Sequence, residues 1–218
     1  AWAVSLSYTF QLYYDFSGYT DMAIGGALMF NIKLPLNFNS PYKALNIQDF
    51  WRRWHMTLSR WLRDYVYIPL GGSHCNQLRT SINLFLTFLI GGIWHGAGWT
   101  FVIWGALHGC ALIIHRFWQK TEIKIHLALA WFMTFMFVNA TWVSFRATEI
   151  SDAGRIFRGM AGLNGFDVSP NFMKALSALY GIPIKLIEAS NISFVTSLVT
   201  FQFIVFFGLI ALLAPNTM

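Results

Sequence analysis

Residues 80–115 read TSINLFLTFLIGGIWHGAGWTFVIWGALHGCALIIH and contain no Asp, Glu, Lys or Arg. A membrane-spanning helix needs roughly 20 apolar residues, and a straight helix of this length would extend for about 54 Å. Glycines at positions 91, 92, 96 and 98 weaken a helix in the middle of the stretch. The stretch therefore predicts a broken helix or a hairpin whose tip carries His95. Irregular backbone at membrane depth must be buried in protein or line a wet cavity, so we also expect a cavity at this tip.

The composition extends this prediction to the whole chain. Of its 218 residues, 56% are hydrophobic and 11% are charged, against about 25% charged in an ordinary soluble domain. A soluble domain of this length has too little interior for so many apolar side chains, and disordered chains are polar. We predict an all-α fold, a polytopic membrane helical bundle that forms a single membrane-embedded unit over residues 1–218. Further spans are expected near residues 1–32, 125–145 and 193–214.

Residues 47–65 have the clearest helical periodicity, with Asn46 as the expected N-cap. The apolar stripe consists of Ile47, Phe50, Trp51, Trp54, Leu58, Trp61, Leu62 and Tyr65. The other faces carry Arg52, Arg53, Arg60, Arg63 and Asp64. This pattern predicts one basic amphipathic helix that lies at the membrane surface instead of crossing it.

The net charge of +6 does not indicate a nucleic-acid partner. The 15 Lys and Arg are separated by long uncharged stretches and do not form one basic face. Seven of them lie within residues 33–79 and three within residues 116–124. Basic loops of membrane proteins face the cytoplasm, so a hairpin at 80–115 would put both segments on that side. The two cysteines, Cys75 and Cys110, are too few for a disulfide framework or a metal cluster.

Two histidines are the first candidates for chemistry. His95 lies deep in an uncharged run, where an ionisable side chain is costly and by default indicates function; its alternative role is a hydrogen bond that packs two helices. His55 lies at the boundary between the apolar and basic faces of the expected amphipathic helix. It either points into a site at the membrane edge or is hydrated at the interface. Arg52 and Arg53 belong to a cationic face that attracts anionic lipid without any substrate.

Several segments together resemble the membrane-bound O-acyltransferase family, in particular its bacterial alginate O-acetyltransferase-like branch. They are YDFSGYTDMAIG at 14–25, NFNSPY at 37–42, FWRRWHMTLS at 50–59, RDYVYIPLGG at 63–72, GIWHGA at 92–97 and WGALHG at 104–109. The resemblance covers about residues 8–118 and corresponds to the C-terminal portion of longer family members.

The resemblance implies that His95 is the catalytic histidine and His55 the second polar residue of the active site. Further candidates for substrate binding are Asp15, Arg52, Arg53, Trp94 and His108. It also implies an O-acetyltransferase of a bacterial inner membrane, with several spans and with no bound cofactor or metal. The donor would be acyl-coenzyme A or another acyl thioester. The acceptor would be an extracytoplasmic polysaccharide such as alginate, or a periplasmic or membrane-anchored partner protein for acetyl transfer.

Two other classes of protein fit the residues alone. A proton- or solute-coupled transporter could use Asp15, Asp21, His55 and His95 as relay groups, although transporters commonly contain internal repeats and the sequence has none. A haem protein could use His95 and His108 as axial ligands. The family resemblance favours the acyltransferase over both.

Overall fold

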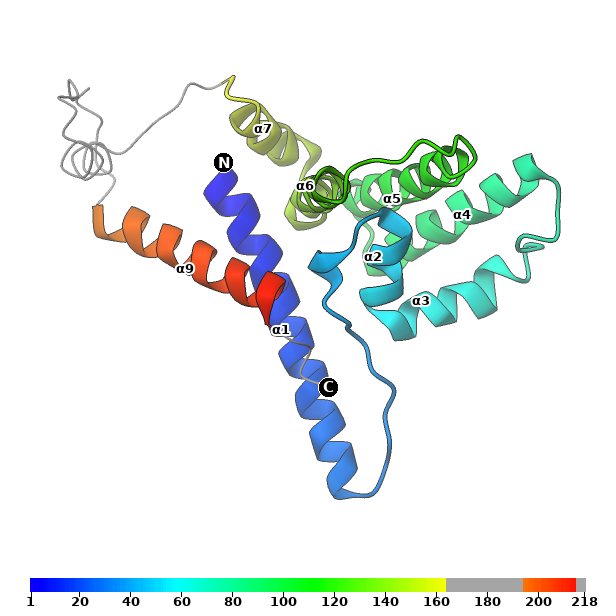
Figure 1. The fold of residues 1–218 in the computed structure, drawn as a ribbon, viewed down its shortest axis with the longest axis horizontal. Coiled ribbons are helices and arrows are strands. Elements are labelled where there is room, and N and C mark those ends of the chain that lie inside the picture. Colours follow the sequence, from blue (N-terminus) through cyan, green and yellow to red (C-terminus); the bar gives the residue numbers. More distant parts are fainter. Residues whose placement is uncertain (164–193, 215–218) are drawn as a thin grey trace.

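The computed structural model describes residues 1–163 and 194–214, and within these ranges the regular elements are all helical. The long helices are α1 (Trp2–Met29), α4 (Gln77–His95), α5 (Trp99–Trp118), α6 (Leu127–Arg146) and α9 (Phe194–Leu213). The shorter elements are η1 (Pro41–Lys43), α2 (Ile47–Arg53), α3 (Met56–Leu62), η2 (Arg63–Tyr67) and α7 (Ile150–Met160). The predicted all-α fold is confirmed (Figure 1).

The uncharged stretch at 80–115 forms an antiparallel helical hairpin, as predicted. Helix α4 ends at His95, and α5 begins at Trp99 after a short turn that contains Gly96 and Gly98. Gly91 and Gly92, which we expected to help break the helix, instead lie within α4. Neighbouring-helix packing outweighs their weak helix propensity.

Close packing between α4 and α5 depends on glycine. A Cβ atom on Gly92 would lie 2.4 Å from the carbonyl oxygen of Phe101, and one on Gly105 would lie 2.5 Å from that of Phe88. The two backbones can therefore approach each other only because neither residue has a side chain. This contact fixes the position of His95 relative to the residues of α5.

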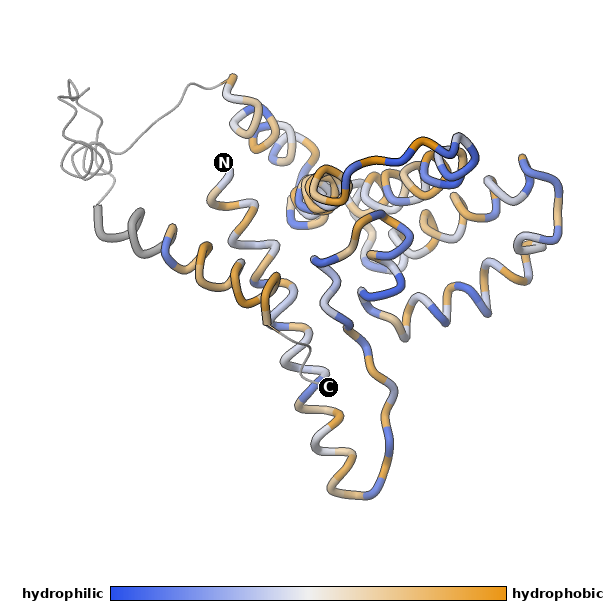
Figure 2. The backbone as a smooth tube through the Cα atoms, in the orientation of Figure 1, coloured by the Kyte–Doolittle hydropathy of each residue, from blue (hydrophilic) through white to orange (hydrophobic). Residues whose placement is uncertain are grey.

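Two of the described helices, α5 and α6, are long and apolar enough to cross a membrane. Helix α6 matches the span expected at 125–145, and α9 covers most of the one expected at 193–214. The first expected span is helical as α1 but is not among those that meet the criterion of length and hydropathy. Figure 2 shows that the coloured part of α9 is mainly hydrophobic, whereas α3 carries several strongly hydrophilic residues.

Helix α1 packs against α6 and α9 through polar contacts as well as apolar ones. The hydroxyl of Ser5 donates to Oδ1 of Asn139 at 2.7 Å, and Nδ2 of Asn139 donates to the hydroxyl of Thr9 at 2.7 Å. All three side chains are buried. On α9, the carbonyl oxygen of Phe207 accepts a hydrogen bond from the hydroxyl of Tyr14 at 2.7 Å. These bonds hold the N-terminal half of α1 beside the aromatic core.

The amphipathic segment differs from the single helix that we predicted over 47–65. It is interrupted at Trp54 and His55, giving α2 and α3, and it continues as the π-helical turn η2. Asn46 caps α2 as expected, with its side chain accepting a hydrogen bond from the backbone N–H of Asp49. The interruption bends the chain so that α2 packs into the core, while Trp61 at the end of α3 stays exposed.

Candidate active site

His55 stands at the break between α2 and α3 with φ of 42° and ψ of 55°, which is left-handed backbone. Asn, Asp and His tolerate this conformation better than other residues that have a side chain. An extended segment runs past the break and satisfies its backbone groups. The N–H of Asn39 donates to the carbonyl oxygen of Arg53, and the N–H of Met56 donates to that of Asn37, both at 2.9 Å.

The side chain of His55 is held on two sides. Its Nδ1 lies 2.9 Å from Oδ1 of Asn37 and 3.3 Å from the hydroxyl of Thr57. The ring of Phe16 packs edge-on against it, with 4.8 Å between the centroids. Burial, and to a smaller degree the nearby His95, lower the pKa of His55 to about 4. The imidazole of His55 is therefore neutral at physiological pH.

His95 is the last residue of α4 and lies among aromatic rings. Its ring centroid is 5.3 Å from that of Trp104 on α5 and 5.1 Å from that of Phe145 on α6, both in edge-on geometry. The two flanking rings come from different helices, so the hairpin and α6 together orient this imidazole.

His55 and His95 line one cavity of about 90 Å³. This volume exceeds that of a single water molecule and suits a small acyl group and the atom that attacks it. The other lining residues are apolar or aromatic: Leu12, Phe16, Trp51, Trp54, Leu58, Trp104, Trp142 and Phe145. The expectation of a cavity at the hairpin tip is thus confirmed, and the cavity contains both histidines that the sequence singled out.

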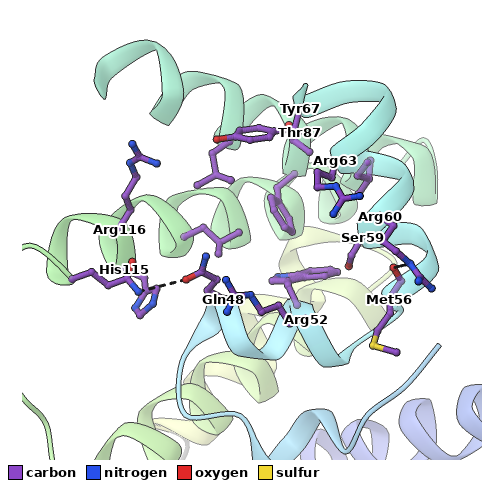
Figure 3. A pocket seen from close by; sticks show the side chains of 16 residues that line it. Gln48, Arg52, Met56, Ser59, Arg60, Arg63, Tyr67, Thr87, His115 and Arg116 are labelled. Atoms are coloured by element: carbon purple, nitrogen blue, oxygen red, sulfur yellow. Dashed lines mark hydrogen bonds between the residues drawn. The ribbon is translucent and has the colours of Figure 1, made fainter. Parts of the chain in front are cut away.

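A larger cavity of about 560 Å³ has Trp51 in common with the first one. Figure 3 shows the basic side chains around it: those of α2, α3 and η2 on one side, and those of α5 on the other. They are Arg52, Arg60, Arg63, His115 and Arg116. No carboxylate is among the residues that line this cavity. The space is therefore electrostatically suited to an anionic ligand.

The remaining predicted site residues are scattered. Arg53, unlike Arg52, does not line the larger cavity; it pairs with Asp49 at 2.8 Å. Asp15 is exposed on α1 next to Phe16. Trp94 is 64% exposed, and its ring lies 5.0 Å from that of His95.

His108 is fully buried and accepts a hydrogen bond from the indole N–H of Trp51. In the described ranges, no three His, Cys, Asp or Glu side chains are grouped so that they could hold a metal ion.

Sequence reasoning missed Asn37 as a partner of His55 and missed the aromatic residues of the smaller cavity. Asn37 belongs to the NFNSPY segment, so its presence in a quoted motif was the available signal. The aromatic residues follow ordinary helical spacing, which does not separate a cavity wall from a packed core.

Comparison with known proteins assigns the chain to a family. A profile described as the membrane-bound O-acyltransferase family matches residues 1–150. The chain belongs to the membrane-bound O-acyltransferase family. The resemblance seen in its motifs is confirmed, and both histidines of the smaller cavity lie within the matched residues.

Similar proteins are named for acyl transfer to peptidoglycan, alginate or teichoic acid. The chain is 63% identical over 169 residues to a peptidoglycan O-acetyltransferase of Helicobacter pylori, covering 76% of this chain and 32% of that protein. It is 48% identical over 170 residues to a probable alginate O-acetylase of Azotobacter vinelandii, covering 78% and 34%. It is 39% identical over 124 residues to a teichoic acid D-alanyltransferase of Bacillus subtilis, covering 54% and 31%. The chain thus spans about one third of the length of these curated relatives.

Proposed function

We propose that this chain carries the acyl-transfer site of a membrane O-acyltransferase. The enzyme transfers an acetyl or other short acyl group from a thioester donor to a hydroxyl of an extracytoplasmic polysaccharide or of a partner protein. The observation that carries this proposal is the cavity shared by His55 and His95. The names of the similar proteins support an acyl group as the transferred unit and a cell-surface polymer as the acceptor.

In the proposed reaction, His95 is the general base. Neutral imidazole suits this role because its ordinary pKa of about 6.5 lies near the working pH. His95 takes the proton of the acceptor hydroxyl while the hydroxyl oxygen attacks the thioester carbonyl carbon. The new C–O bond forms, the C–S bond breaks, and the proton passes from His95 to the departing thiolate. His55 orients the acceptor or the donor, or donates a hydrogen bond to the developing oxyanion.

The larger cavity would bind the phosphate-bearing part of the donor. Arginine forms charge-assisted hydrogen bonds with phosphate, and three arginines of the segment 52–63 line this space together with Arg116. Because Trp51 lines both cavities, a donor held by these arginines would have its thioester end close to the two histidines. Coenzyme A and a phosphopantetheine carried by a protein both meet this description.

The orientation follows from the two basic segments. Nζ of Lys120 donates to Oε1 of Gln77 at 2.6 Å, so the start of α4 and the end of α5 lie at the same end of the hairpin. The positive-inside rule favours the cytoplasmic side for this end. We therefore infer that the protein crosses a bacterial inner membrane several times, with the arginine-lined cavity toward the cytoplasm.

The test is an acyl-transfer assay on the full-length gene product in membranes, with radiolabelled acetyl-coenzyme A as the donor. We expect label to appear in a polysaccharide or protein fraction with the wild type, and to disappear with His95→Ala. Wild-type transfer by folded His95→Ala protein would contradict the proposed site. Absence of transfer with acetyl-coenzyme A, but transfer from an acylated carrier protein, would identify the other donor class.

A further inference from the structure

Asn37 lies in the extended segment that runs past the break between α2 and α3, and it is 7% exposed. Its side-chain oxygen Oδ1 contacts three groups of His55, at this break, and of Thr57, just after it. Nδ1 of His55 is 2.9 Å away, the hydroxyl of Thr57 is 2.8 Å away, and the backbone nitrogen of Thr57 is 3.3 Å away. A single buried oxygen thus gathers three potential donors around the histidine.

The backbone contact determines which way the amide of Asn37 points. An Asn side chain has an oxygen that only accepts hydrogen bonds and a nitrogen that only donates them, and the two are distinguished by their partners. The backbone N–H of Thr57 can only donate. The atom of Asn37 that faces it must therefore be the oxygen, and the same atom faces His55.

This orientation in turn determines the tautomer of His55. Because Oδ1 of Asn37 can only accept, Nδ1 of His55 must donate and so must carry the ring proton. A neutral imidazole has one N–H, and its other nitrogen has a lone pair. In His55 the lone pair is on Nε2.

We propose that Asn37 is a positioning residue that holds His55 in its Nδ1-protonated form, so that Nε2 accepts a hydrogen bond from a substrate hydroxyl. This inference rests on the proposed acyl transfer to a hydroxyl. The tautomer decides between the two roles considered for His55, which are to orient a substrate or to donate a hydrogen bond to the oxyanion. An Nε2 atom with a lone pair can orient a hydroxyl, but it cannot donate to an oxyanion. Sugars carry hydroxyls on adjacent carbons, so one can bond to His55 while the next gives its proton to His95.

The side chain of Asn37 is not needed to close the helix break. The backbone of the same segment already does so, through the bonds from Met56 to Asn37 and from Asn39 to Arg53. Removing the side chain therefore leaves those two bonds in place. The three contacts of Oδ1 therefore serve mainly to orient the imidazole of His55 and the first turn of α3 at Thr57.

The experiment compares Asn37→Ala with Asn37→Asp in the full-length gene product. Loss of the acceptor in Asn37→Ala allows both tautomers, and we expect kcat to fall about 10-fold to 100-fold with an unchanged KM for the donor. Asn37→Asp keeps the acceptor, and its kcat should recover to within about fivefold of the wild type at alkaline pH. Its carboxylate also stabilises imidazolium, so the acidic limb of the rate profile should move to higher pH by at least one unit.

Apart from the side chain at position 37 itself, the charged surroundings of His55 are the same in both variants. Among the described residues, His95 on α4 is the titratable group that acts on its pKa. If the role of Asn37 were purely structural, both replacements would lower the unfolding temperature. The acidic limb of the pH–rate profile would then stay at its wild-type pH. That result, or wild-type kcat in folded Asn37→Ala, would overturn the proposal. If Asn37→Ala does not fold, the pH–rate profile of Asn37→Asp alone tests the proposal.

A second measurement does not depend on activity. In protein labelled with 15N-histidine, the nitrogen resonances of His55 distinguish a protonated nitrogen from one with a lone pair, and His55→Asn identifies them by their loss. We expect Nδ1 protonated and Nε2 unprotonated in the wild type, with a mixture in Asn37→Ala. The opposite tautomer in the wild type would overturn the proposal even if acyl transfer is confirmed. The expected tautomer in a protein without transfer activity would contradict only the proposed function.

Discussion

The indole N–H of Trp51 donates a hydrogen bond to Nδ1 of His108 over 3.1 Å. His108 is fully buried, and its ring lies 4.9 Å from that of Trp104 and 6.4 Å from that of Phe50. This bond links α2 to α5 behind the wall of the smaller cavity. We therefore expect His108 to support the site through packing, whereas the resemblance implied a role in substrate binding.

Replacement of His108 by Ala should lower stability more than chemistry. It removes a buried ring and leaves the N–H of Trp51 without its acceptor, and such changes cost about 2–5 kcal/mol. We expect a lower unfolding temperature in detergent, with kcat per folded molecule reduced less than tenfold. A variant with a wild-type unfolding temperature and no transfer would instead show that His108 takes part in the reaction.

Replacement of His95 by Ala should instead lower the rate of the reaction more than it lowers stability. General-base catalysis contributes about 10²-fold to 10⁴-fold, so kcat should fall by that factor while the unfolding temperature changes by no more than a few degrees. His74→Ala provides the matched control, because His74 is an exposed histidine in the loop before α4. Equal losses in both variants would contradict the role of His95.

The pH dependence of stability should report the buried state of His55. Its pKa of about 4 lies below the ordinary value of about 6.5 in the unfolded chain. Between these two values the unfolded chain binds a proton that the folded protein does not, so stability falls as the pH falls. Above pH 6.5 the residue makes no such contribution.

We therefore expect the unfolding temperature to decrease from pH 6.5 to pH 4, and to decrease less in His55→Asn. Asn tolerates the left-handed backbone at this position and does not titrate, which makes it the appropriate replacement. Identical profiles for the two proteins would show that His55 is solvated in the folded state.

Charge reversal in the larger cavity should weaken donor binding. Arg52→Glu and Arg60→Glu each remove a charge that would contact phosphate, and a lost charge-assisted hydrogen bond of about 1.5–3 kcal/mol corresponds to roughly tenfold or more in KM. Arg79→Glu is the control, because Arg79 lies near the same end of the hairpin and does not line the cavity. Unchanged donor kinetics in all three variants would favour lipid as the partner of these arginines.

The contact between α4 and α5 should not tolerate even one methyl group. Gly105→Ala would push a Cβ to 2.5 Å from the carbonyl oxygen of Phe88, and overpacking of this kind costs about 1–3 kcal/mol. Gly154→Ala in α7 meets no atom within 4 Å and should be neutral or slightly stabilising, because Ala favours helix. Unfolding temperatures of the two variants test this contrast, which would be contradicted if both changes raised stability.

Much of the fold was predictable because lipid leaves the chain few alternatives. Uncharged stretches had to become helices, and the glycines around His95 had to include a turn, which the structure places at residues 96–98. Helical spacing could not reveal the break at His55. That break depends on hydrogen bonds from an extended segment more than ten residues earlier, and periodicity within 47–65 carries no information about such a partner.

The candidate site was predictable in its two histidines and less so in its surroundings. His95 was identified by the cost of an ionisable group in an uncharged run, and His55 by its place at the boundary between the apolar and basic faces of the expected helix. Both also lie in the family motifs. Arg52 and Arg53 looked equivalent as neighbours on one basic face, yet Arg53 pairs with Asp49 and Arg52 lines the larger cavity. The difference comes from the bend after α2, which no property of the arginines themselves indicates.

Trp51 lines both cavities, and this has a consequence for a cell that depends on ion gradients. Under the proposed function, an acyl group passes from one face of an energised membrane to the other, and the path that it takes must not conduct protons. In such an enzyme, the indole ring that borders both cavities would interrupt a continuous file of water, while a slender thioester arm passed beside it to the histidines. We therefore expect replacement of Trp51 by a small side chain to let protons leak across the membrane and dissipate the proton-motive force. This leak would slow growth before it lowered the rate of acylation.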